Sequence, residues 1–166
     1  MASVILKVDD DISTDIIFPG RFMATVLPAE TPQYAFADLP VNRRLQSGEA
    51  PAGSVVVAGN NFGCGSSREQ AASCLKGLGL KIIARSFARI FLQNAINLGV
   101  DMVICPQIEA QEGDQVVVQG GRVINLTSGR VFAIEPLPPT RQAIIDAGGL
   151  IPYTRQRLVT ERGGGG

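Results

Sequence analysis

Histidine is absent from the 166 residues of this chain, and its absence excludes more chemistry than any other gap in the composition. Histidine is the commonest general base and the most frequent metal ligand in proteins. A serine–histidine–aspartate triad is therefore impossible within the chain. Any base that the chain supplies must be of another residue type.

Cysteine is scarce as well. Cys64, Cys74 and Cys105 are too widely and irregularly spaced for a C-x-x-C metal or redox motif, so we expect no metal site in this chain. An odd number of cysteines without a signal-like N-terminus favours the reducing cytoplasm. We expect Cys74 and Cys105 to be small core residues, and Cys64 to pack beneath a glycine turn.

Neither a dominant charge nor a long apolar run is present. Fifteen basic residues balance fifteen acidic ones without a basic cluster, which argues against nucleic-acid binding. No apolar run approaches the ~20 residues that cross a bilayer, so we expect no membrane span. The length and the hydrophobic content of 45% suit one compact domain over residues 1–162. We expect the glycine run 163–166 to be disordered.

The most informative segment is 60–70, with the sequence NNFGCGSSREQ. The β-branched run 55–57 before it predicts a buried strand, and the apolar residues after it have helical spacing. The predicted helix begins near Ser66 or Ser67 and ends at Gly79. Backbone N–H groups and the positive end of the helix dipole point at such a turn, which therefore favours an anion.

A capping box is the structural explanation for one of the two serines. Ser66 with Glu69, or Ser67 with Gln70, matches the S-x-x-E/Q pattern of a helix N-terminus. A cap needs neither the second serine nor Arg68. We therefore interpret the whole segment as a substrate-binding site.

The remaining pattern predicts an α/β domain with a mixed sheet. Apolar strands at 3–8, 81–84 and 102–105 enclose helical patterns, one of them capped by Ser86 and ended by Gly99, and this order favours parallel strands. Ligands then bind beyond the carboxyl ends of the strands. The turn within segment 60–70 that contains Ser66 and Ser67, called the serine turn below, lies there. Further predicted elements are a short helix at 33–39, a polar connection at 42–51, hairpin strands at 115–119, 122–126 and 130–135, a last short helix at 140–147 and a packed tail at 150–158.

An acidic turn follows the first strand. Asp9, Asp10 and Asp11 together indicate a solvated loop, but Asp15 lies next to the apolar pair Ile16–Ile17. An ionised side chain beside buried residues needs a partner. From the residues alone, a functional and a structural role for Asp15 remain equally open.

Four motifs resemble the small-subunit family of 3-isopropylmalate dehydratase, in the aconitase superfamily, over nearly the whole chain. They are DISTDIIFPGR at 11–21, GNNFGCGSSREQ at 59–70, SFARIF at 86–91 and NAINLG at 94–99. The resemblance implies an α/β swivelling domain, a three-layer β/β/α sandwich whose mixed sheet combines parallel βαβ units with antiparallel hairpins. It also implies a cytoplasmic hydro-lyase of leucine biosynthesis that is active only with a large subunit. That partner would carry a [4Fe–4S] cluster, and this chain none.

The resemblance assigns roles to four residues. Ser66 would be the catalytic base, acting as an alkoxide that removes a proton beside a substrate carboxylate. Ser67 and Arg68 would hold carboxylate oxygens. Asp15 would be catalytic by contacting a histidine of the partner. Since this chain has no histidine to activate Ser66, cationic surroundings and exclusion of water at the subunit junction must favour its alkoxide.

Substrate choice in the family is expected to depend on the loop 21–28. Its substrate-binding candidates are Arg21, Phe22, Met23, Ala24 and Thr25. The apolar character of the loop favours an alkyl substituent on a 2-hydroxy diacid, so we prefer isopropylmalate. Dimethylmalate, methylmalate (citramalate) and homocitrate or homoaconitate remain open as alternatives. We also expect the isolated subunit to be able to self-associate through its partner face.

Two other classes of function compete with this interpretation. A phosphate- or nucleotide-binding module could use the glycine turn, but the chain lacks the lysine of a P-loop and the spacing of a dinucleotide fingerprint. A subunit that only scaffolds its partner would tolerate alanine at position 66.

Overall fold

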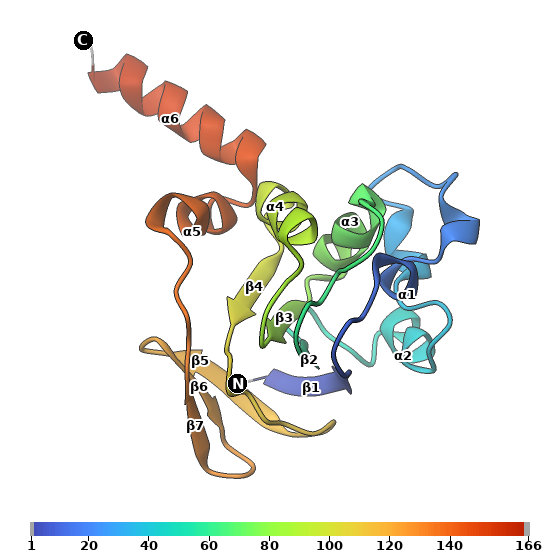
Figure 1. Cartoon of the computed structure of the whole chain (residues 1–166). Helices are drawn as coiled ribbons and strands as arrows, with labels where there is room; N and C mark the ends of the chain where they lie inside the picture. The colour runs from blue at the N-terminus through green and yellow to red at the C-terminus, as the bar shows by residue number, and fades with distance from the viewer. Residues whose placement is uncertain (1, 165–166) are drawn as a thin grey trace.

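The computed structural model describes residues 2–164, with side chains to residue 160, and this part of the chain forms one seven-stranded mixed sheet. The strand order is β4-β3-β2-β1-β5-β6-β7 (Figure 1). Strands β1 to β4 are parallel, and β1 pairs with β5 in antiparallel fashion. The predicted mixed α/β sheet is confirmed. The strands are β1 (Ala2–Lys7), β2 (Val55–Ala58), β3 (Lys81–Ala84), β4 (Asp101–Ile104), β5 (Gln115–Gln119), β6 (Arg122–Asn125) and β7 (Arg130–Ala133).

Two crossover helices connect the parallel strands. Helix α3 (Glu69–Leu78) joins β2 to β3, and α4 (Arg89–Leu98) joins β3 to β4. Both end at the predicted glycines, Gly79 and Gly99, whose φ angles of +66° and +77° lie in the left-handed region. Glycine adopts this conformation without the steric cost of a Cβ atom, so each helix stops where its sequence indicates.

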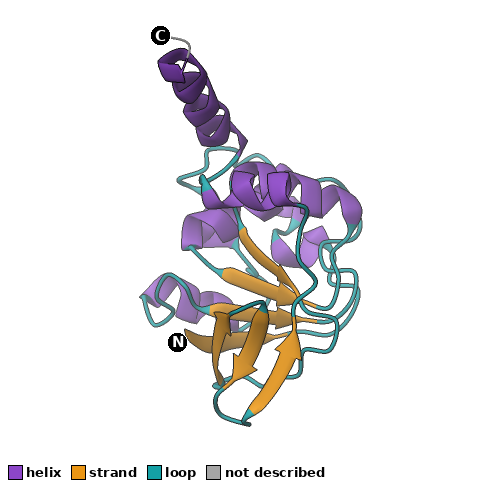
Figure 2. Cartoon of the chain, turned by 90° about the vertical axis from the view of Figure 1, so that its left-hand side faces the viewer, coloured by secondary structure: helices purple, strands orange, loops and turns teal. Residues whose placement is uncertain are grey.

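The alternation of side chains along the parallel strands divides the core in two. Val56 and Ala58 of β2 face a cluster shared with the helices, while Val55 and Val57 face a second cluster shared with the hairpins. Both faces of these strands are buried, as expected for parallel strands covered on both sides. Figure 2 shows the helices and the antiparallel strands in separate layers.

The start of α3 differs from the prediction. The helix begins at Glu69 rather than at Ser66 or Ser67, and its N-cap residue is Arg68, in extended conformation and without a side-chain cap. Neither proposed capping box forms. Ser86 does not cap α4 either, because the N-cap residue of that helix is Ala88. The turns before both helices are held by neighbouring segments of chain, which override the local capping signals.

The segment between β1 and β2 is more helical than predicted. It contains α1 (Thr14–Ile17) and two 3-10 turns, η1 (Gly20–Phe22) and η2 (Thr31–Tyr34), so the helix expected at 33–39 is only a short turn. Helix α2 (Val41–Ser47) replaces most of the expected polar connection. Val41 and Leu45, one turn apart, are its buried residues, and this sparse pattern explains why the helix was missed.

The C-terminal segment forms two helices. Helix α5 (Pro139–Asp146) confirms the helix predicted at 140–147, but α6 (Leu150–Gly164) replaces the packed tail. Helix α6 projects from the body (Figure 1), and Ile151 and Val159 are 67% and 71% exposed. The expectation for residues 163–166 stays untested, because α6 reaches Gly164 and residues 165–166 lie outside the described part. No helix within residues 2–164 is long and apolar enough to span a membrane.

Candidate active site

The serine turn is held by a continuation of the β1–β2 pairing beyond the strand ends. The backbone N–H of Gly63 donates to the Ile12 carbonyl oxygen at 2.7 Å, and that of Thr14 donates to the Cys64 carbonyl oxygen at 2.8 Å. The chain after β1 therefore runs beside the chain after β2. Parallel neighbours in the sheet thus bring the Asp15 region to the serine turn, although the two are about 50 residues apart in sequence.

Two residues with a left-handed backbone conformation lie shortly after the ends of β1 and β2, where the paired chains leave the sheet. Asp11 and Asn61 have φ angles of +58° and +60°, and the Asn61 amide donates to the Asp11 carboxylate at 3.0 Å. Asparagine and aspartate tolerate this conformation better than other residues with a Cβ atom. On the other side, the Asn61 backbone N–H donates to the Ser86 hydroxyl at 2.8 Å, and the Ala88 N–H donates to the Phe62 carbonyl at 2.9 Å. The serine turn is thus the middle one of three paired segments.

Both serines are exposed and line a cavity of about 300 Å³. The Asn94 side-chain amide, from α4, lies 3.4 Å from the Ser67 hydroxyl, whereas the Ser66 carbonyl oxygen accepts a hydrogen bond from the Thr14 hydroxyl at 2.8 Å. Two adjacent hydroxyls therefore face a hollow at the carboxyl edge of the sheet. Residues 14, 61, 63–68, 88–91 and 94 line the cavity.

The charged side chains that line this cavity, among the described residues, are Arg68 and Arg89. Both are cations, and the N-termini of α3 and α4 add positive ends of helix dipoles. No carboxylate is among the lining residues, and Arg68 is paired with Asp15, which lies outside the lining, so Arg89 and the helix N-termini make the cavity suit an anion. Arg89 was not predicted as a site residue. Its place depends on the bridge between Phe62 and Phe87, which brings the start of α4 to the serine turn.

Asp15 finds its partner in Arg68. The Arg68 Nη1 atom donates to the Asp15 carboxylate at 2.7 Å and to the Phe18 carbonyl oxygen at 3.1 Å. Together with the Gly20 backbone N–H, which donates to the same carboxylate oxygen at 2.7 Å, the guanidinium holds the pKa of Asp15 below its ordinary value. The Arg68 bond is the largest cause of this shift. The ion pair orients Arg68 at the rim of the serine cavity.

Replacing Arg68 by glutamine should raise the pKa of Asp15 toward its ordinary value. A carboxyl group with a lowered pKa stabilises the fold at pH values above its ordinary, unfolded-state pKa. This stabilisation is lost as the pH falls through the lowered pKa of the folded state. Carboxyl NMR titrations of wild type and Arg68→Gln measure the change. Asp114, whose pKa is lowered by hydrogen bonds from the Gln111 backbone N–H and the Asn125 side chain, is the internal control and should not move. An unchanged pKa of Asp15 in the variant would contradict the assigned cause.

The loop candidates 21–25 do not line the serine cavity. Arg21 forms a bidentate ion pair with Asp38 and lies over the Phe22 ring, 4.5 Å from its centroid. The Met23 carbonyl oxygen accepts a hydrogen bond from the Gln70 amide at 3.3 Å, which ties the loop to α3. Ala24 is exposed and Thr25 half-buried. The substrate role of these five residues stays a prediction.

The cysteines are separate from one another. Cys74 and Cys105 are fully buried, as predicted, and burial raises the pKa of both thiols, so they are core residues without thiolate character. Cys64 is half-buried and lines the serine cavity. No three histidine, cysteine, aspartate or glutamate residues gather to hold a metal ion within the described chain.

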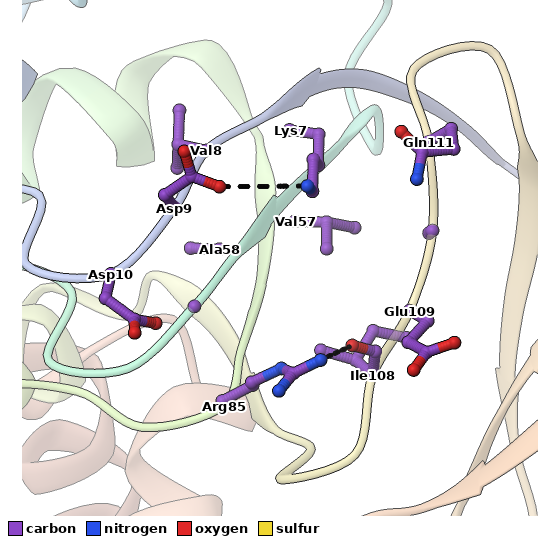
Figure 3. Close-up of a pocket in the computed structure, with 12 residues that line it drawn as sticks. Lys7, Val8, Asp9, Asp10, Val57, Ala58, Arg85, Ile108, Glu109 and Gln111 are labelled. Atoms are coloured by element: carbon purple, nitrogen blue, oxygen red, sulfur yellow. Dashed lines mark hydrogen bonds and ion pairs between the residues drawn. The ribbon is translucent and has the colours of Figure 1, made fainter.

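A larger cavity, of about 530 Å³, lies at the same edge of the sheet between the ends of β1 to β3 and the segment 108–111 (Figure 3). Several of its charged side chains already have partners within the protein. Lys7 lies 3.7 Å from Asp9, Asp10 accepts a hydrogen bond from the Asn60 N–H at 2.6 Å, and Arg85 donates to the Ile108 carbonyl oxygen at 3.0 Å. The serine cavity, with its cationic lining, is the stronger candidate site.

Comparisons with known proteins agree with this choice. A family model described as the aconitase C-terminal domain matches residues 28–105, which include the serine turn. A 3-isopropylmalate dehydratase small subunit from Thermodesulfovibrio yellowstonii is 41% identical over 160 residues, 93% of this chain and 94% of that protein. The chain belongs to the 3-isopropylmalate dehydratase small-subunit family.

Two further proteins similar to this chain come from Methanocaldococcus jannaschii. An isopropylmalate/citramalate isomerase small subunit is 39% identical, with 92% of each chain covered. A crystal structure of 3-isopropylmalate dehydratase matches this fold with a TM-score of 0.86 at 35% identity, covering 96% of each chain. The predicted family and its aconitase-type swivelling β/β/α fold are confirmed.

Proposed function

We propose that this chain is the small subunit of a heteromeric hydro-lyase that converts 2-isopropylmalate to 3-isopropylmalate by dehydration and rehydration. One observation carries the proposal: two adjacent serine hydroxyls share a cavity with Arg68 and Arg89 and with no carboxylate. A 2-hydroxy diacid is a dianion of a size that such a cavity can take. The names of the relatives support isopropylmalate as the substrate.

Three polar residues of the cavity then have chemical roles. Ser66, an exposed residue that lines the cavity, removes the proton beside a substrate carboxylate, and the surrounding positive charge lowers the cost of its alkoxide. Ser67 and Arg68 hold carboxylate oxygens. Since Arg68 Nη1 is engaged by Asp15 and the Phe18 carbonyl, its other nitrogen atoms bind the substrate.

The partner in this proposal is a large subunit that carries a [4Fe–4S] cluster. The cluster would supply the Lewis acid that takes the leaving hydroxyl. The three separated cysteines of this chain do not form a ligand set for such a cluster, so its ligands belong to the partner. Asp15, 62% exposed beside Arg68, is free to contact a histidine of the partner on its outer side. The cytoplasm is the proposed compartment.

Citramalate is the second candidate substrate. The isopropylmalate/citramalate isomerase subunit among the relatives favours it, and its methyl group is a smaller version of the same alkyl substituent. The loop 21–28 suits either, because Val26 and Leu27 expose 66% and 58% of their surface. An apolar loop discriminates poorly between alkyl groups that differ by a few carbons.

Reconstitution with the large subunit tests the function. We expect kcat/KM to be highest for isopropylmalate, followed by dimethylmalate and citramalate, with homocitrate last because a second charged arm meets an apolar loop. The purified small subunit alone, as the control, should turn over none of them. Robust turnover by the isolated chain, or homocitrate as the best substrate, would contradict the proposal.

A further inference from the structure

Thr14 lies between the two proposed catalytic residues and contacts the serine turn twice. Its backbone N–H donates to the Cys64 carbonyl oxygen and its hydroxyl to the Ser66 carbonyl oxygen, both at 2.8 Å. The next residue, Asp15, binds Arg68 at 2.7 Å. Residues 14 and 15 therefore hold three alternate residues of the turn, which are Cys64, Ser66 and Arg68.

The backbone at Ser66 has little stiffness of its own. Gly65, directly before it, has a φ angle of +92°, and Gly63 has one of +88°. Glycine is the residue with the greatest backbone freedom, so two glycines leave the turn permissive. Helix α3 begins only at Glu69 and does not fix position 66. The hydrogen bond from Thr14 is thus the side-chain contact that holds the Ser66 backbone within the described structure.

Resting on the proposed function, we propose that Thr14 is a positioning residue, whose hydroxyl sets the backbone of Ser66 and so aims the Ser66 hydroxyl at the substrate. Thr14 lines the cavity but is buried, with 3% of the residue exposed, and its hydroxyl donates a hydrogen bond to the Ser66 carbonyl oxygen. The Thr14 hydroxyl acts on the position of Ser66 rather than on the substrate. The rate of a reaction between positioned groups depends on small displacements, and a misplacement of about 1 Å can lower it about 10²-fold.

A purely structural role is the competing explanation, since a buried hydroxyl needs a hydrogen-bond partner wherever it lies. The chain contains a matched example. Ser54 precedes β2, at the opposite end of that strand from the serine turn, has 3% of its surface exposed, and donates to the Pro51 carbonyl oxygen at 2.7 Å. Loss of the Ser54 hydroxyl reports what a buried bond of this kind contributes to stability alone.

Two pairs of variants, each differing mainly by the hydroxyl, test the proposal in the complex reconstituted with the large subunit. The pairs are wild type with Thr14→Val, and Thr14→Ser with Thr14→Ala. Within each pair, loss of the hydroxyl should lower kcat by about 10- to 100-fold, because a displacement of the reacting group by up to about 1 Å can cost about 10²-fold in rate. KM should change little, because the substrate contacts remain. Thr14→Ser should retain most of the wild-type kcat.

Ser54→Ala is the control. It should lower the melting temperature about as much as Thr14→Val does and leave kcat unchanged. If Thr14→Val does not fold, the Thr14→Ser and Thr14→Ala pair decides. Equal kcat within the pairs, with Ser66→Ala inactive, would overturn the role of Thr14 and leave the proposed function intact. An active Ser66→Ala complex would instead overturn the proposed function itself.

Discussion

Replacing Ser66 by alanine should lower kcat of the reconstituted complex by about 10²- to 10⁴-fold, the range that a positioned general base contributes. Ser66 is an exposed residue, and the contact that holds it uses its carbonyl oxygen, which alanine keeps. Folding and subunit assembly should therefore be unchanged. Steady-state kinetics on isopropylmalate, with circular dichroism and analytical ultracentrifugation of the variant, measure both parts of this expectation.

Ser67→Ala is the neighbouring comparison. Because Ser67 is proposed to bind a carboxylate oxygen rather than to move a proton, its loss should act more on KM than on kcat. The ratio of the two effects separates the roles of adjacent hydroxyls. Near-normal turnover of Ser66→Ala would remove the base from this chain and support a subunit that only scaffolds its partner.

Replacing Gly63 by alanine should destabilise the isolated chain severely. A Cβ atom at this position would lie 2.2 Å from Cγ of Phe91, and the φ angle of +88° is strained for any residue with a side chain. Overpacking costs about 1–3 kcal/mol and the left-handed conformation about 1–2 kcal/mol, so we expect a loss of roughly 2–5 kcal/mol in the free energy of unfolding. Denaturant titration of the purified subunit measures it.

Gly65→Ala provides the matched control. Its φ angle of +92° is similar, but the nearest atom to an added Cβ, in Ser13, is 3.7 Å away. This variant should show the conformational cost without the clash. If Gly63→Ala is no less stable than Gly65→Ala, the packing of Phe91 against the turn does not restrict position 63. A larger loss of unfolding free energy in Gly63→Ala than in Gly65→Ala would reflect the close approach of Phe91, in α4, to the serine turn.

Contiguous features of this protein were predictable from its sequence. The strand at 55–57, the glycine turn and the hydroxyls at positions 66 and 67 lie in one stretch, so a local pattern contains both the strand and turn and the two serines that line the cavity. The C-terminal ends of α3 and α4 were also correct, because Gly79 and Gly99 end them by backbone conformation alone. These are the cases in which local preference and tertiary structure agree.

Features that depend on distant pairing were not predictable in the same way. The partner of Asp15 is 53 residues away at Arg68, and the place of Arg89 in the cavity requires the Phe62–Phe87 bridge. The same pairing explains why α3 begins later than its capping signals indicate. Thr14 binds the Ser66 carbonyl oxygen, and the turn stays extended where an isolated peptide would start a helix.

The segments around the serine turn are joined to one another by backbone hydrogen bonds, whereas the loop 21–28 is tied to helix α3 by the bond from Gln70 to the Met23 carbonyl oxygen. Mutations in the loop should therefore leave the pairing of the serine turn intact. Under the proposed function, a lineage could then exchange one alkyl-substituted diacid for another by changing the loop alone. Such a division between a constant chemical unit and a variable recognition unit allows one scaffold to serve several metabolic steps.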